Sequence, residues 1–172
     1  MSAGLRNGLI VAAIQVAMVL SLGGKLLYDR ATRPRVWVRA GAFDPNLPIR
    51  GRYLAERLEM PAEGFTLNAP RQTVLFPMSY NSGYTQLRDG QLIATTQGSG
   101  PRIFFRLQMR DGQMIAQMEE PVLIFISEHA NIPRLQPGEE TWVEVTVPAK
   151  GPPRPIRVGV KKDGVLTPLS LE

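Results

Sequence analysis

The chain has 172 residues, a net charge of +5 and no cysteine. This length fits one domain beside a membrane anchor and is too short for two full domains. The absence of cysteine excludes disulfide bonds, thiolate chemistry and Cys-ligated zinc. Residues 1–35 hold five basic side chains against one acidic, whereas residues 36–172 hold 15 against 14. Because the larger part is nearly neutral, we expect no nucleic-acid partner.

The N-terminal part of the chain is strongly hydrophobic. Leu9–Tyr28 spans 20 residues, which as a helix reaches about 30 Å and matches the hydrocarbon core of a bilayer. We predict a transmembrane anchor over residues 1–28, with the lipid bilayer as a partner. A cleaved signal peptide is the alternative, but no Ala-x-Ala-like site follows the apolar run. Gln15 lies in mid-span and is a candidate contact with a partner helix, although a single amide is also tolerated in one span.

The sequence after the anchor has the texture of a β domain. We assign residues 29–35 to a juxtamembrane linker and residues 36–172 to a β-rich extramembrane domain, because short apolar runs alternate with Pro and Gly turns. The predicted fold class is mostly β: a single N-terminal transmembrane helix plus a small antiparallel β-sandwich or barrel-like domain. The predicted strands are Arg35–Ala40, Arg52–Met60, Gln91–Thr96, Arg102–Met109, Gln113–Met118, Pro121–Ser127, Thr141–Val147, Pro155–Lys161 and Val165–Leu171.

Two of these strands need an argument of their own. Arg52–Met60 contains good helix formers, but its alternation and its Pro-bounded entry favour a strand. Pro121–Ser127 is a continuous apolar run, which indicates a strand buried on both faces. Asp-Gly pairs at 89–90, 111–112 and 163–164 mark turns between strands.

Alternation also sorts the stretch 102–110 into two faces. We expect Ile103, Phe105, Leu107 and Met109 to point toward the core. The opposite face carries Arg102, Phe104, Arg106, Gln108 and Arg110, and it is a candidate site for anionic lipid, glycan or an acidic partner. A solvated strand face is the simpler interpretation of the same charges.

Residues suited to catalysis are sparse. His129 is the single histidine, and its neighbourhood to Ser127 in sequence is not the geometry of a triad. One His without Cys is too thin a ligand set for zinc. The pairs Glu119-Glu120 and Glu139-Glu140 are more simply polar strand edges than acid/base pairs. We therefore expect no enzyme activity, no cofactor and no metal.

A membrane-tethered serine hydrolase is the enzymatic alternative. Its layout, similar to that of signal peptidases, needs a nucleophilic Ser just after the span and a Lys general base. No Ser lies between Ser21 and Ser79, and the lysines of the domain are all late in the chain. The required nucleophile position is missing.

The stretch Asp44–Leu58, which reads DPNLPIRGRYLAERL, resembles the GDYXXLXY family of small bacterial membrane-anchored proteins. In that family a span is followed by an Asp-Pro turn and a Pro-x-Arg-Gly-Asp-Tyr strand entry. The matching residues here are Asp44, Pro45, Pro48, Arg50, Gly51 and Tyr53. The chain departs from the motif at Arg52, Glu56 and Leu58, where the family has Asp, Leu and Tyr.

The resemblance implies a location and a kind of function. It implies a single-pass protein of the bacterial inner membrane with a periplasmic domain, often encoded beside a multi-span membrane protein. The positive-inside rule, taken literally, would instead place the domain in the cytoplasm. We expect a non-catalytic accessory or interaction protein that partners a multi-span membrane protein, with a lipid- or glycan-binding envelope module as the alternative. The candidate contacts with the partner are Gln15 and the matching residues from Asp44 to Tyr53; the alternative uses Arg102, Phe104 and Arg106.

Overall fold

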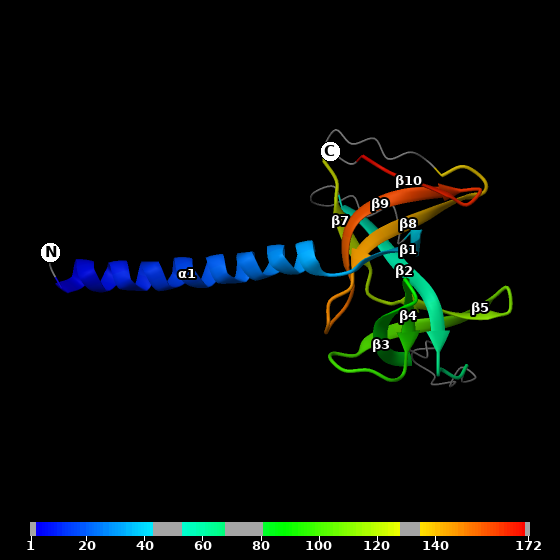
Figure 1. Cartoon of the computed structure of the whole chain (residues 1–172), viewed down its shortest axis with the longest axis horizontal. Helices are drawn as coiled ribbons and strands as arrows, with labels where there is room; N and C mark the ends of the chain where they lie inside the picture. The colour runs from blue at the N-terminus through cyan, green and yellow to red at the C-terminus, as the bar shows by residue number, and fades with distance from the viewer. Residues whose placement is uncertain (1–2, 43–52, 68–80, 128–134, 171–172) are drawn as a thin grey trace, which may run out of the picture. The chain divides into compact units, whose positions relative to one another are not determined.

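The computed structural model describes residues 3–42, 53–67, 81–127 and 135–170. The chain divides into two compact units, Met1–Arg33 and Pro34–Glu172. Within the described residues, the first contains the helix α1 (Ala3–Thr32), and the second contains ten strands (Figure 1). The predicted fold class, one N-terminal apolar helix followed by a mostly β domain, is confirmed.

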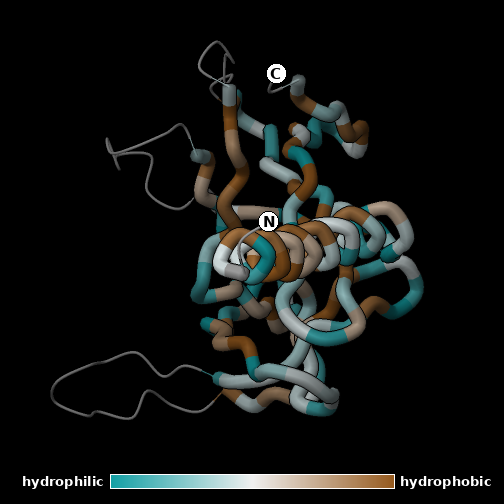
Figure 2. The backbone as a smooth tube through the Cα atoms, turned by 90° about the vertical axis from the view of Figure 1, so that its left-hand side faces the viewer, coloured by the Kyte–Doolittle hydropathy of each residue, from teal (hydrophilic) through white to brown (hydrophobic). Residues whose placement is uncertain are grey.

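Helix α1 is long and apolar enough to cross a membrane, as judged by its length and composition. Large apolar side chains are exposed all around it, including Val19, Leu20 and Leu27, each about two-thirds exposed or more. In Figure 2, which looks at the helix nearly end-on, many of its residues are coloured as hydrophobic. A helix that is apolar on every side is suited to lipid rather than to water.

The connection between helix and domain is shorter than the sequence predicts. We expected a linker over residues 29–35, but α1 runs to Thr32 and β1 begins directly after Pro34. The helix continues because Arg33 pairs with Asp29 one turn earlier, through its backbone N–H at 3.0 Å and its Nε at 3.3 Å. It ends there because a proline disfavours helical geometry in the preceding residue and lacks an N–H of its own.

The ten strands form one sheet, and five of them close into a ring. The order is β10-β9-β8-β1-β2-β4-β3-β5-β6, with a further pairing of β6 to β2, and β7 also pairs with β2. All pairings are antiparallel except β2–β4. The strands are β1 (Arg35–Ala42), β2 (Tyr53–Glu63), β3 (Asn81–Arg88), β4 (Gln91–Thr95), β5 (Ile103–Arg110), β6 (Gln113–Met118), β7 (Val122–Phe125), β8 (Glu139–Thr146), β9 (Arg154–Lys162) and β10 (Val165–Pro168).

Strand β2 is shared by two groups of strands. Its C-terminal half pairs with β6 at Glu59–Pro61 and with β4 at Ala62–Glu63, which closes the ring β2-β4-β3-β5-β6. Its N-terminal residues Tyr53–Glu56 pair with β7. In Figure 1 β2 runs from the group of β7 to β10 toward the group of β3 to β5. This double use makes the domain barrel-like, as the sequence predicts.

One hydrophobic core runs through both groups. Its fully buried side chains include Leu58 and Met60 of β2. The strand interpretation of this segment, in preference to a helix, is therefore confirmed. The other largest buried side chains are Phe105, Leu92, Met118, Val143, Val145 and Val158.

Strand β7 corrects the prediction of a strand buried on both faces. Val122 and Ile124 are buried, but Leu123 and Phe125 are 58% and 67% exposed. The reason is that β7 covers the core with one face while the other faces solvent, so its apolar run alternates in burial. Met109 also departs from the expected core face, since it is 55% exposed next to the β5–β6 turn.

Candidate functional site

The outward face of β2 and β7 carries a cluster of exposed apolar side chains. Tyr53 lies opposite Phe125 in the strand register, and Leu123 lies opposite Ala55. The rings of Tyr53 and Phe125 meet edge to face, with centroids 5.7 Å apart. Tyr53 is 54% exposed, similar to the two β7 residues. We call Tyr53, Leu123 and Phe125 the apolar patch.

This patch is unusual for a strand with one solvent face. Such strands normally place polar side chains outward, whereas β7 places Leu123 and Phe125 there. Among the described strands β7 has β2 as its one hydrogen-bonded neighbour. Exposed apolar side chains beside a strand edge are features of surfaces that bind other proteins.

The predicted contact region is seen in part. Tyr53 begins β2 and belongs to the apolar patch. Sequence reasoning missed Leu123 and Phe125, because it took their apolar run as wholly buried; the two-residue period across a four-residue strand was the available signal. The other candidates of this region lie outside the described residues: Asp44, Pro45, Pro48, Arg50 and Gly51.

Gln15, the polar residue in the middle of the predicted anchor, lies on an apolar helix. Gln15 is exposed on α1, and Val11 and Val19, one turn away on either side, are exposed as well. A lone amide on such a surface is able to bond a neighbouring helix in lipid. Its role as a contact stays a prediction.

The predicted basic face of β5 is largely neutralised. Arg106 Nη2 lies 3.4 Å from Glu119 Oε2, and Arg110 pairs with Glu59. Arg102 and Phe104 are exposed, Phe104 by 59%. The five-residue face is therefore not a continuous cationic surface, because carboxylates of β2 and of the residue after β6 pair with two of its three arginines.

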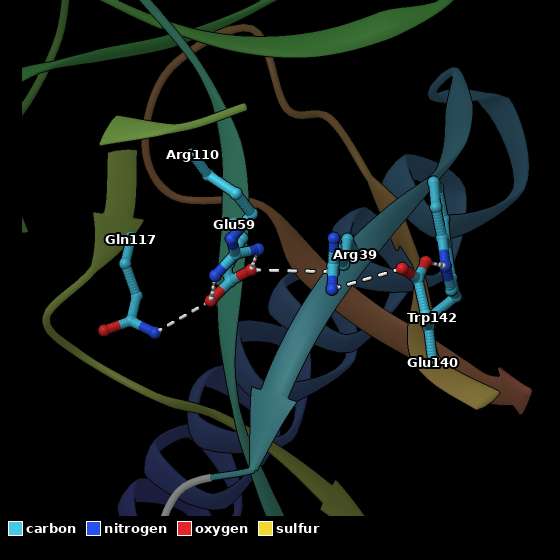
Figure 3. A network of polar contacts seen from close by, with 6 residues as sticks. All are labelled: Arg39, Glu59, Arg110, Gln117, Glu140 and Trp142. Carbon is cyan, nitrogen blue, oxygen red and sulfur yellow. Dashed lines mark hydrogen bonds and ion pairs between the residues drawn. The ribbon is translucent and has the colours of Figure 1, made fainter. Parts of the chain in front are cut away.

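Glu59 is the centre of a buried polar network (Figure 3). Its side chain is 7% exposed. Arg110 donates to both carboxylate oxygens, at 2.6 and 3.3 Å, and Gln117 Nε2 donates to Oε1 at 3.1 Å. These bonds to Glu59 raise the pKa of Arg110 above its usual range. Gly41 leaves room for the carboxylate, since a Cβ there would lie 3.3 Å from Glu59 Oε1.

The network continues across β1 to β8. Arg39 lies between two carboxylates, with Nε 3.7 Å from Glu59 and Nη2 3.1 Å from Glu140 (Figure 3). Trp142 Nε1 donates to Glu140 at 3.1 Å, and Lys161 Nζ lies 4.3 Å from the centroid of the Trp142 ring. An open hollow of about 380 Å³ lies beside these residues. Because each carboxylate already binds cations or an indole N–H, the network acts as a brace between strands.

Three of the four paired glutamates of the sequence are held in ion pairs: Glu119, Glu139 and Glu140. Glu119 binds Arg57 at 3.3 Å in addition to Arg106. Glu139 accepts from Lys162 at 3.2 Å, and a hydrogen bond from the Gln136 backbone lowers the pKa of Glu139. In the described parts of the chain, no group of three or more His, Cys, Asp or Glu is placed to hold a metal. His129 lies outside the described residues.

Glu56 is a second buried carboxyl of β2. It is 2% exposed, and its Oε2 has no hydrogen-bond partner. Burial raises the pKa of Glu56 to about 7. An acid therefore occupies a core position of the strand.

Comparison with protein-family models, with curated proteins and with solved structures finds no match for this chain. The resemblance to the GDYXXLXY family therefore stays a prediction. Function must be argued from the surfaces described above.

Proposed function

We propose that this protein is a single-pass, membrane-anchored interaction subunit whose β domain docks onto a membrane-protein partner. The observation that carries the proposal is the apolar patch of Tyr53, Leu123 and Phe125. Three large apolar side chains, each more than half exposed, lie together on one face. Exposure of these apolar side chains to water is unfavourable, and burial against a protein partner would relieve it.

The short connection to the helix supports a partner in the same membrane. Two residues, Arg33 and Pro34, separate α1 from β1. Fully extended, the three steps from Thr32 to Arg35 span about 11 Å, so the domain cannot move far from the end of the helix. A partner that binds the patch must itself be at the membrane.

The proposal places the protein in the bacterial inner membrane, with its β domain in the periplasm and a multi-span membrane protein as partner. Support for this location and this kind of partner comes from the GDYXXLXY resemblance and from the polar Gln15 in the anchor. Gln15 would make a second contact, within the bilayer, by hydrogen bonding to a helix of the partner.

We propose a non-enzymatic function because the side chains of the polar clusters bind one another. Glu59, Glu119 and Glu140 each bind at least one arginine. Lys161 Nζ lies 4.3 Å from the centroid of the Trp142 ring, so a cation already occupies one face of this indole. The apolar patch, in contrast, remains more than half exposed.

Site-specific photo-crosslinking tests the docking surface directly. A photoreactive amino acid replaces Phe125 in the full-length protein in cells, and Val165 of β10, which is 68% exposed, is the matched control. We expect the photoreactive residue at position 125 to give one discrete crosslinked product, in which a single other protein is joined to this chain. We expect no such product from position 165. Identical patterns at the two positions would refute docking through the patch.

Substitution then measures the energy of the contact. Aromatic anchors at interfaces contribute about 2 kcal/mol or more, which corresponds to about 30-fold in affinity. We expect Phe125→Ser to lower partner recovery in mild detergent severalfold and Val165→Ser to leave it unchanged. Equal recovery for both variants would contradict the assignment of Phe125 to the interface.

A further inference from the structure

Three segments of the β domain meet around Pro34, the residue where the domain begins. The carbonyl of Pro34 accepts a hydrogen bond of 3.0 Å from the Val147 N–H at the end of β8. Next to it, Arg35 pairs in register with Thr146, and Thr146 pairs with Arg154 of β9. The start of β1, the end of β8 and the start of β9 therefore form one rim.

A loop from the other strand group joins the same rim. A Cβ placed on Gly100 would lie 3.4 Å from Lys150 Cβ, and one on Gly151 would lie 4.0 Å from Pro101 Cγ. The segments 96–102 and 147–154 thus pack against each other. We define the basic rim as Arg35, Arg102, Lys150 and Arg154, all of which are exposed.

The charge of this rim is one-sided. Residues 34–38, 96–102 and 147–154 contain these four basic residues and no acidic residue. Without Arg102, Lys150 and Arg154, residues 36–172 hold 12 basic and 14 acidic side chains. The nearly neutral domain is therefore polarised, with positive charge gathered where the chain enters it.

An apolar side chain adjoins the basic rim. Phe104, Pro101 and Pro152 line an open hollow of about 620 Å³ together with Arg102, Ile103, Glu119 and Glu120. Glu119 is bound by arginines of β2 and β5, which leaves Glu120 as the exposed acidic residue at this margin. Phe104 is 59% exposed. Cations around an exposed aromatic side chain are typical of surfaces that contact membranes.

The rim is also close to the anchor along the chain. The apolar run of α1 ends at Tyr28 and the helix ends at Thr32, which adds about 6 Å of helix. Three further residues reach Arg35 and add at most about 11 Å. The headgroup region covers about 5–8 Å of this path beyond the hydrocarbon core. The remaining distance, about 10 Å at full extension, is comparable to the Debye length of about 8 Å at physiological salt, so the headgroups are able to attract charges on the rim.

We propose that the basic rim binds the anionic surface of the bilayer in which α1 is anchored, with Phe104 as its apolar contact. The inference rests on the proposed membrane anchoring but not on the partner. Its occupant is anionic lipid, because four cations without a carboxylate in their own segments complement a negative surface. The contact replaces the predicted basic face of β5, of which Arg102 and Phe104 are the residues that take part.

The absence of cysteine allows a clean test with single spin labels. Full-length Ser99→Cys and Val165→Cys carry the label in nanodiscs of phosphatidylcholine alone or with phosphatidylglycerol. Ser99 lies in the loop of the rim, and Val165 lies on β10 as the control. We expect the label at 99 to lose accessibility to a neutral, water-soluble relaxation agent in anionic nanodiscs only. At 1 M salt, where the Debye length is about 3 Å, this loss should disappear.

A pair of double variants shows whether the cations cause the effect. Arg102→Gln with Lys150→Gln should abolish the loss of accessibility at position 99. Arg88→Gln with Lys162→Gln removes the same charge from the exposed ion pairs with Glu63 and Glu139, and should leave the loss intact.

Each outcome of this test separates the two proposals. Equal accessibility at position 99 in both lipids, in protein that elutes with the nanodiscs, would overturn the lipid contact and spare the anchor. Protein that does not elute with the nanodiscs would overturn both. A loss that persists in zwitterionic nanodiscs or at high salt would also overturn the proposal, since it would not depend on charge.

Discussion

Glu56 and Glu59 lie three residues apart on β2, and both are buried, yet their surroundings differ. Glu59 points to the face where Arg110 and Gln117 bind its two oxygens. Glu56 points to the opposite face, as strand alternation requires, and its Oε2 has no partner. The first carboxyl is a charged brace, whereas the second is an acid kept in the core.

The pKa of Glu56 predicts an acid-favoured stability. Its folded value of about 7 stands above the ordinary 4.5. Below pH 4.5 both states bind the proton; between 4.5 and 7 the unfolded chain releases it first, so the free energy of unfolding falls as pH rises. A shift of this size lowers the free energy of unfolding by about 3 kcal/mol, and this loss is complete above pH 7. Urea unfolding of the full-length protein in detergent at pH 5 and pH 8 measures it.

Glu56→Leu isolates this contribution, because every other titrating group is common to both proteins. We expect the variant to be the more stable protein at pH 8 by about 2 kcal/mol or more, with a much flatter dependence on pH. Parallel pH curves for the wild type and the variant would show that Glu56 does not titrate in this range.

The Glu59 network predicts a strong contrast between two Arg–Glu pairs. Glu59→Ala leaves the partly buried Arg110 without its carboxylate and should cost about 2–3 kcal/mol of unfolding free energy. Glu63→Ala removes an exposed pair with Arg88 and should cost less than about 1 kcal/mol. Chemical denaturation of the two variants under one condition gives the comparison. Similar losses would mean that the network does not brace the strands.

At the scale of elements, turn chemistry made the hairpins predictable. Asp89, Asp111 and Asp163 all adopt positive φ, at 50, 51 and 48°, and each is followed by a glycine that does the same. These Asp-Gly pairs connect β3 to β4, β5 to β6 and β9 to β10. Local sequence sufficed here, because few residue pairs accept this backbone geometry.

Two features of the strands could not be predicted from local sequence. Strand β3 (NSGYTQLR) is polar and contains Gly83, so it lacks the usual strand pattern; pairing with β4 on one side and β5 on the other makes it a strand. The run containing Leu123 and Phe125 looked wholly buried. Its partner strands, rather than its own residues, decide which face is covered.

Gly83 shows how closely β3 approaches its neighbours. A Cβ at this position would lie 2.5 Å from the Thr95 carbonyl oxygen and 2.7 Å from Phe65 Cζ. We expect Gly83→Ala to lower stability by about 1–3 kcal/mol through overpacking. Thermal unfolding monitored by β-sheet circular dichroism measures this loss. Ser82→Ala, a neighbour on the same strand, is the control, and an equal small effect of both would contradict the close approach.

At the scale of the whole molecule, the sequence predicted the parts better than the surfaces. An apolar 20-residue run and alternating strands sufficed to predict the apolar N-terminal helix and the β domain. The basic rim escaped notice because its four residues are far apart in sequence. Strand pairing brings Arg35 and Arg154 together, and the packing of segments 96–102 and 147–154 adds Arg102 and Lys150. Likewise Arg106 and Arg110 looked free until β2 and the residue after β6 supplied their carboxylates.

The two proposed surfaces serve one purpose in this account. The anchor and the basic rim hold the β domain at the membrane, and the apolar patch meets the partner there. In the proposed complex Gln15 would add a contact inside the bilayer, so Gln15→Leu should weaken the complex without affecting the fold of the β domain. Recovery of the partner with this variant, compared with Val19→Leu on the same helix, measures that contribution.

The central claim is tested most directly by purification of the tagged full-length protein in mild detergent, followed by quantitative mass spectrometry. The account predicts a stoichiometric membrane-protein partner with the wild type and its loss with Leu123→Ser combined with Phe125→Ser. Recovery of the wild-type protein alone, even after chemical crosslinking in cells, would contradict the claim that this is an interaction subunit.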